Sequence, residues 1–204
     1  MFVRALKLTY AMEQSQQDLP KIPELTGLLV KSEYITNPAI ENELPEANVA
    51  SLLTMHQLGL SWRHEWDEAG RVCLQIMDRF YPQTLSGASA AMNFGLYLWM
   101  RQRDLDGAER MFKDILDRAP YDGITPHVER LLAKLYAKQK RYDESLALLD
   151  KVIERIDPSQ TGPLGRCRKK AVRLREAALQ LKASGGIPPQ IPPPGTGSAT
   201  PGGH

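Results

Sequence analysis

The fold is decided by one stretch, Arg103-Asp-Leu-Asp-Gly-Ala-Glu-Arg-Met-Phe-Lys-Asp-Ile-Leu-Asp-Arg-Ala-Pro120. Its apolar side chains recur at spacings of 4, 3 and 1 residues, which is typical of a helix with one buried face. These side chains are Ala108, Phe112, Ile115 and Leu116. Asp104 or Asp106 can accept hydrogen bonds from the free amides of the first turn. Pro120 ends the helix because it has no amide hydrogen and clashes with the preceding turn.

Two other stretches repeat this pattern, which predicts a short array of helix pairs. Residues 141–158 give a close copy, and residues 64–82 give a weaker one that also ends in proline. One amphipathic pair cannot bury its own apolar face, so neighbouring pairs stack and the end of the array needs a cap. We expect a turn over residues 85–87 and a helix cap at Asn48. The expected helices span residues 48–62, 65–81, 88–102, 106–118, 126–139, 143–156 and 163–181.

The helix pairs resemble tetratricopeptide repeats over residues 48–158, because small, branched and aromatic residues recur at the positions which that family uses. The third pair is most similar and supplies Leu132, Ala133, Tyr136, Ser145, Leu149 and Val152. The second pair supplies Trp99, Ala108, Phe112, Ile115 and Pro120. Its Gly95-Leu96 reverses the usual order of those two residue types. The first pair fits at Ala69, Cys73, Ile76 and Pro82.

This resemblance implies an all-α fold, a tetratricopeptide-like α-solenoid of about three helix pairs with a C-terminal capping helix. The stripe of the capping helix consists of Cys167, Ala171, Leu174, Ala178 and Leu181. We expect three parts: a helical and irregular segment over residues 1–47, the repeat domain over residues 48–182, and a tail over residues 183–204. The tail is rich in proline and glycine and is predicted to be disordered, because it has little apolar surface to bury.

Composition is that of an ordinary globular protein, with 42% hydrophobic and 25% charged residues. A formal net charge of +2 gives no general attraction to nucleic acid or acidic lipid. Cys73 and Cys167 match no metal or redox spacing and are predicted to be small buried side chains. We find no secretory signal and no transmembrane segment, and we therefore expect a cytoplasmic protein.

The first candidate site is the concave groove that a tetratricopeptide-like fold implies. Seven polar residues of the second and third pairs are expected to point into it, and they favour an acidic peptide or helix as the partner. They are Asn93, Tyr97, Arg101, His127, Arg130, Lys134 and Lys138. A solvated helix face without a ligand is the alternative. Tyr97 and Leu131 stand where a carboxylate clamp needs polar groups, so a clamp of the chaperone-binding kind is not expected.

The second candidate site is a basic patch on the last helix. It consists of Arg166, Arg168, Lys169, Lys170, Arg173 and Arg175. Such a run can bind the phosphates of RNA or anionic lipid headgroups, which would give peripheral membrane association. It contains no aromatic side chain on which bases could stack, so nucleic acid is a less favoured partner than protein. A solvated face of the capping helix is the alternative.

No catalytic pattern is present, and the chain is not expected to be an enzyme. The four histidines have no metal-ligand spacing, and there is no Gly-rich phosphate loop, so we expect neither metal nor cofactor. The leading hypothesis is a non-catalytic protein-interaction scaffold or adaptor. The alternative rests on residues 28–34, 37–39 and 41–45, which resemble the soluble C-terminal region of O-antigen ligase and polymerase-like membrane enzymes. In that case the chain is a detached or truncated accessory domain of glycan assembly.

Overall fold

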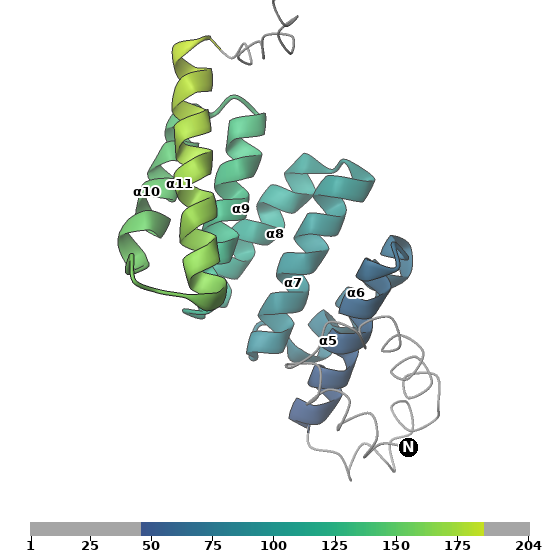
Figure 1. Ribbon diagram of the computed structural model, residues 1–204. Coiled ribbons are helices and arrows are strands. Elements are labelled where there is room, and N and C mark those ends of the chain that lie inside the picture. The colour runs from purple at the N-terminus through teal and green to yellow at the C-terminus, as the bar shows by residue number, and fades with distance from the viewer. Residues whose placement is uncertain (1–45, 186–204) are drawn as a thin grey trace, which may run out of the picture.

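The computed structural model describes residues 46–185, which form seven α-helices and one π-helical segment without any strand (Figure 1). The helices are α5 (Glu46–Trp62), α6 (Trp66–Phe80), α7 (Leu85–Tyr97), η2 (Leu98–Gln102), α8 (Leu105–Arg118), α9 (Thr125–Lys138), α10 (Tyr142–Arg155) and α11 (Gly162–Ala183). The N-terminal segment and the tail that the sequence predicts lie almost wholly outside the described residues.

The helices follow one another as a row of antiparallel neighbours. Each helix packs against the next one in the chain, from α5 at one end of the row to α11 at the other (Figure 1). In addition, α5 contacts α7 and α9 contacts α11, so the first helices of successive pairs lie against each other at both ends. The predicted all-α solenoid of three pairs with a further C-terminal helix is therefore confirmed. The last helix takes the place that the first helix of a fourth pair would take.

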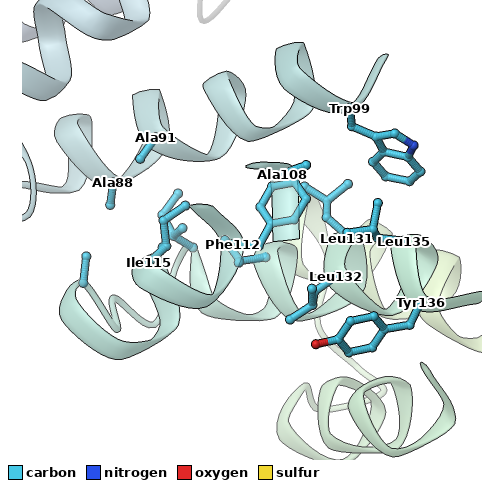
Figure 2. Packing of buried hydrophobic residues seen from close by; sticks show 13 residues of the cluster. Ala88, Ala91, Trp99, Ala108, Phe112, Ile115, Leu131, Leu132, Leu135 and Tyr136 are labelled. Atoms are coloured by element: carbon cyan, nitrogen blue, oxygen red, sulfur yellow. The ribbon is translucent and has the colours of Figure 1, made fainter. Parts of the chain in front are cut away.

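The core consists of three clusters spaced along the row. The middle cluster joins α7, α8 and α9, and Phe112 lies at its centre between Ala108 and Ile115 (Figure 2). All three side chains are fully buried, which confirms the stripe predicted for this helix. Cys73 and Cys167 are buried free thiols, as predicted. Such a chain of clusters is what a stack of repeats produces, since each pair buries its face against its neighbours.

Helix α8 begins where the sequence predicts, and the structure decides between its two candidate caps. The carboxylate of Asp104 accepts a hydrogen bond of 2.7 Å from the amide of Gly107. Asp106 lies within the first turn, where its charge interacts favourably with the helix dipole. Asp104 is therefore the capping residue.

Replacing Asp104 with alanine is expected to lower the free energy of unfolding by about 1 kcal/mol, because the Gly107 amide loses its acceptor. Asp106→Ala is the matched control, since it removes the same charge from the same turn without removing a cap bond. Urea denaturation of both variants would measure the difference. Equal losses would show that charge, and not capping, is what Asp104 contributes.

Two predicted helix starts are wrong. Residues 85–87 do not form the turn, because Leu85 is already the first residue of α7. The hydroxyl of Thr84 accepts a hydrogen bond of 3.0 Å from the amide of Gly87, so Thr84 caps this helix and the turn precedes it. At the other site, α5 already includes Glu46, so Asn48 lies inside the helix and does not cap it.

The second pair departs from a regular repeat at the end of its first helix. After Tyr97 the chain widens into the π-helical segment η2, and Arg103 ends it in the left-handed region with φ of 58°. Gly95 explains the reversed residue order in this pair. A Cβ atom at Gly95 would lie 2.6 Å from Cε1 of Phe112, so the position needs glycine for α7 to approach α8 this closely.

Candidate functional site

Two adjacent hollows form the candidate site, and both are lined in part by α7 and η2 of the second pair. The first has a volume of about 290 Å³ and lies between α5, α6, α7 and η2. Its lining is mainly apolar and includes Leu58, Trp66, Ala69, Leu96, Tyr97 and Met100. Gly70 allows the ring of Tyr97 to lie close to α6, since a Cβ atom at Gly70 would lie 3.1 Å from that ring.

Polar side chains on the wall of the first hollow form hydrogen bonds with other side chains of the protein. Asn93 donates to the side-chain oxygen of Gln57 at 2.9 Å, and this bond ties α7 to α5. The hydroxyl of Tyr97 donates to Asp67 at 3.0 Å. The guanidinium of Arg101 stands 5.6 Å from the ring centroid of Trp66. Asn93 and Tyr97 are therefore engaged within the fold, and burial raises the pKa of the Cys73 thiol nearby to about 12, which keeps it protonated.

The second hollow is larger, about 710 Å³, and opens between η2 and α9. Five of its lining residues are apolar, and three carry a positive charge. They are Leu96, Trp99, Met100, Leu105 and Leu131, with Arg103, Lys134 and Lys138. Leu131 is buried at the edge of this hollow. Leu96 and Met100 line both hollows, so the two are neighbours across these side chains.

Cationic side chains cover the indole of Trp99 in the second hollow. The ammonium groups of Lys134 and Lys138 lie 5.4 and 5.9 Å from its ring centroid. Within residues 46–185, neither lysine pairs with a carboxylate, and Arg103 does not either. Met100 is 66% exposed beside them. The hollow therefore combines an apolar floor with positive charges that the described part of the fold does not neutralise.

The structure divides the seven predicted groove residues into three places. Asn93, Tyr97 and Arg101 line the first hollow. Lys134 and Lys138 line the second. His127 and Arg130 lie at the other end of α9, close to the charges of Arg166 and Lys170 on α11. The seven residues therefore lie at three places, although four of them follow one side of α9.

The predicted basic patch is divided in a similar way. Arg175 binds Asp150 of α10 at 2.5 Å, and Arg168 donates to the carbonyl oxygen of Ile153 on the same helix. These two side chains fasten the last helix to its neighbour. The remaining members are exposed, and they are Arg166, Lys169, Lys170 and Arg173.

Arg103 and Leu105 were not among the predicted site residues. The regular helix expected over residues 88–102 gives no indication that the chain widens into a π-helical segment before Arg103. That widening sets the positions of Met100 and Arg103 at the second hollow. Met100, a methionine at the end of an apolar run, was the one signal in the sequence that could have indicated this widening.

Within residues 46–185, no group of three or more histidine, cysteine or acidic side chains is placed to hold a metal ion. None of the described helices combines the length and the apolar character needed to cross a membrane.

The comparison with family models agrees with the repeat pattern. Residues 100–159 match the family described as tetratricopeptide repeat. The match covers α8, α9 and α10, which include the two stretches of sequence with the clearest repeat pattern. No curated protein and no solved structure matches the chain significantly. Residues 100–159 are therefore similar to tetratricopeptide repeats, in agreement with the all-α array of helix pairs that the structure shows.

Proposed function

We propose that this tetratricopeptide-like array is a scaffold that binds an acidic segment of a partner protein at the second hollow. One observation carries the proposal: three cations without carboxylate partners in the described residues surround an apolar floor. Arg103, Lys134 and Lys138 supply the charges, and the buried indole of Trp99 lies beneath the two lysines. A repeat array offers such surfaces because its helices are fixed by the core and not by the ligand.

The shape of the hollow indicates what the segment contains. An apolar side chain would enter between Leu96, Met100 and Leu131 and remove their surface from water. Acidic side chains next to it would accept charge-assisted hydrogen bonds from Lys134, Lys138 and Arg103. A purely acidic segment would leave the floor exposed, and a purely apolar one would leave the cations without partners. The best ligand therefore has apolar and acidic residues in alternation.

Selection from a random displayed peptide library on the full-length protein tests this proposal. We expect enrichment of peptides with a bulky apolar residue beside two or more acidic residues. Lys134→Glu combined with Lys138→Glu should reduce the affinity of the selected peptides at least roughly tenfold, because both charges would repel the ligand. Fluorescence anisotropy with a labelled peptide would measure the affinity.

The matched control is Lys151→Glu combined with Lys169→Glu, which changes the net charge equally at exposed positions on α10 and α11. Circular dichroism would verify that both double variants stay helical. Selected peptides without acidic residues would contradict the proposed ligand chemistry. Equal losses in the two double variants would contradict the proposed position, since the effect would then come from net charge alone.

A further inference from the structure

We propose that cationic side chains on the N-terminal halves of α9 and α11 form a separate anion site, which binds a phosphoryl group carried by the same acidic partner segment. The proposal deepens the proposed function and rests on it. The site consists of His127 and Arg130 on α9 with Arg166 and Lys170 on α11. No part of it belongs to either hollow described above.

The two helices are fixed to each other at this level. The thiol of Cys167 lies 3.5 Å from the carbonyl oxygen of Pro126, to which it donates, and α9 and α11 lie against each other (Figure 1). Arg166 precedes this cysteine directly, and His127 follows the proline. His127 and Arg130 are one helical turn apart, as are Arg166 and Lys170. Two short cationic rows therefore face one another across a fixed contact.

Positive charge at this junction is not compensated within the described residues. Arg130, Arg166 and Lys170 form no ion pair there, and the neighbouring Glu129 is already paired with Arg155 at 2.7 Å. The Nε atom of Arg130 is buried without any hydrogen-bond acceptor. Burial and the charges of Arg130, Lys170 and Arg166 lower the pKa of His127. An anion at this point would relieve the repulsion among these cations.

The helix ends add to the positive potential. The first turns of α6, α8 and α10 each contain acidic residues, which complement the partial positive charge of a helix start. The first turns of α9 and α11 contain none. The starts of the two helices that meet at this junction are therefore not complemented by negative charge, as is also the case for α7.

The number of positive charges at this junction favours a phosphoryl group over a carboxylate. A phosphate monoester carries a charge of about −1.5 to −2 at pH 7 and has three acceptor oxygens. A carboxylate has a single charge, so it would neutralise less of the positive charge of Arg130, Arg166 and Lys170 than a phosphate monoester would. Since two of these donors come from α11 and one from α9, a group with three separate oxygens satisfies both helices at once.

The spacing along α9 relates this site to the second hollow. His127, Arg130, Lys134 and Lys138 follow one another at intervals of 3, 4 and 4 residues. At 1.5 Å per residue, these eleven residues span about 16 Å, which about five residues of an extended peptide would cover. The phosphorylated side chain of the partner segment is therefore expected within about five residues of the apolar residue that enters the hollow.

Titration of the ¹⁵N-labelled full-length protein with phenyl phosphate, followed by NMR, tests the site without any identified partner. We expect saturable shifts of the amides in residues 126–130 and 165–171, and an upward shift of the measured His127 pKa when the anion binds. Arg166→Gln combined with Lys170→Gln should weaken binding at least roughly tenfold, because two charge-assisted bonds are lost. Both positions are exposed, so the fold is expected to tolerate the change.

Lys134→Gln combined with Lys138→Gln is the control, and it should leave these shifts intact while it weakens the peptides selected on the second hollow. This reciprocal result separates the two proposals, since either site can fail while the other responds. Absence of saturable shifts, or shifts that survive the Arg166 and Lys170 substitutions, would overturn the anion site.

A second arm identifies the source of the phosphoryl group. Phosphoserine is placed in turn at each position within about five residues of the apolar anchor of a selected peptide, and at least one of these peptides should bind at least roughly tenfold more tightly than its serine counterpart. No gain would overturn the assignment to a partner segment. Tighter binding of a short oligouridylate, or of vesicles that contain phosphatidylserine, at the same amides would likewise overturn it in favour of nucleic acid or membrane.

Discussion

Replacing Phe112 with alanine is expected to lower the free energy of unfolding by about 3–5 kcal/mol. The ring is fully buried in the middle cluster, where α7, α8 and α9 meet (Figure 2). Without the ring, the protein loses the free energy that is gained when the ring moves out of water. A cavity is also left, which three helices would have to close. Because the cluster joins the second and third pairs, the loss affects the connection between repeats as well as one helix.

Urea denaturation followed by circular dichroism would measure this loss, with Arg110→Ala on the exposed face of the same helix as the control. Arg110→Ala should change stability by less than about 0.5 kcal/mol. A loss below about 1 kcal/mol for Phe112→Ala would show that the cluster collapses around the gap and that the ring is not its centre.

Gly95 provides an independent check on the same contact. In the wild-type protein, Gly95→Ala is expected to cost about 1–3 kcal/mol, because its Cβ atom would stand 2.6 Å from the Phe112 ring. In the Phe112→Ala background the clash is absent, and alanine should then stabilise α7 by about 0.5–1 kcal/mol through its higher helix propensity. A substitution that destabilises in both backgrounds would show that Gly95 is required for a reason other than the ring.

The sequence was sufficient to predict the array, because each helix repeats a local rule. Ala108, Phe112 and Ile115 are spaced for one face of a helix, and all three are buried. Proline after the stripe and aspartate before it mark the two ends of α8. Such signals depend only on residues that are close together in the sequence, so they can be recognised without knowledge of the fold.

The candidate site was predicted only in part, because it depends on how helices meet. The widening of the chain over η2 brings Arg103 and Met100 to the second hollow, and no local pattern in the sequence predicts it. Likewise, His127 and Arg130 were expected in a groove with Lys134, whereas their neighbours are Arg166 and Lys170 on a helix some forty residues away in the chain. The spacing of residues in the sequence determines which of them share one face of a helix. The tertiary structure determines which other helix lies beside that face.

Replacing Gly87 with alanine is expected to lower the free energy of unfolding by about 2–3 kcal/mol. The first turn of α7 lies against the end of α6, and a Cβ atom at Gly87 would stand 2.5 Å from the carbonyl carbon of Phe80 and 2.7 Å from the amide nitrogen of Tyr81. These are backbone atoms and cannot rotate away, so the helix start itself would have to move. That movement would also disturb the bond between the Gly87 amide and the Thr84 hydroxyl.

Gly123→Ala is the matched control, because a Cβ atom there would meet nothing within 4 Å. It should leave the native contacts intact and stabilise the protein by about 0.4–1 kcal/mol, since alanine restricts the unfolded chain more than glycine does. The same chemical change is therefore expected to have opposite signs at two glycines of one protein. Effects of the same sign and size in urea denaturation would show that the close approach of α7 to α6 does not limit residue 87, and that Gly87 is no more constrained than a glycine in an open loop.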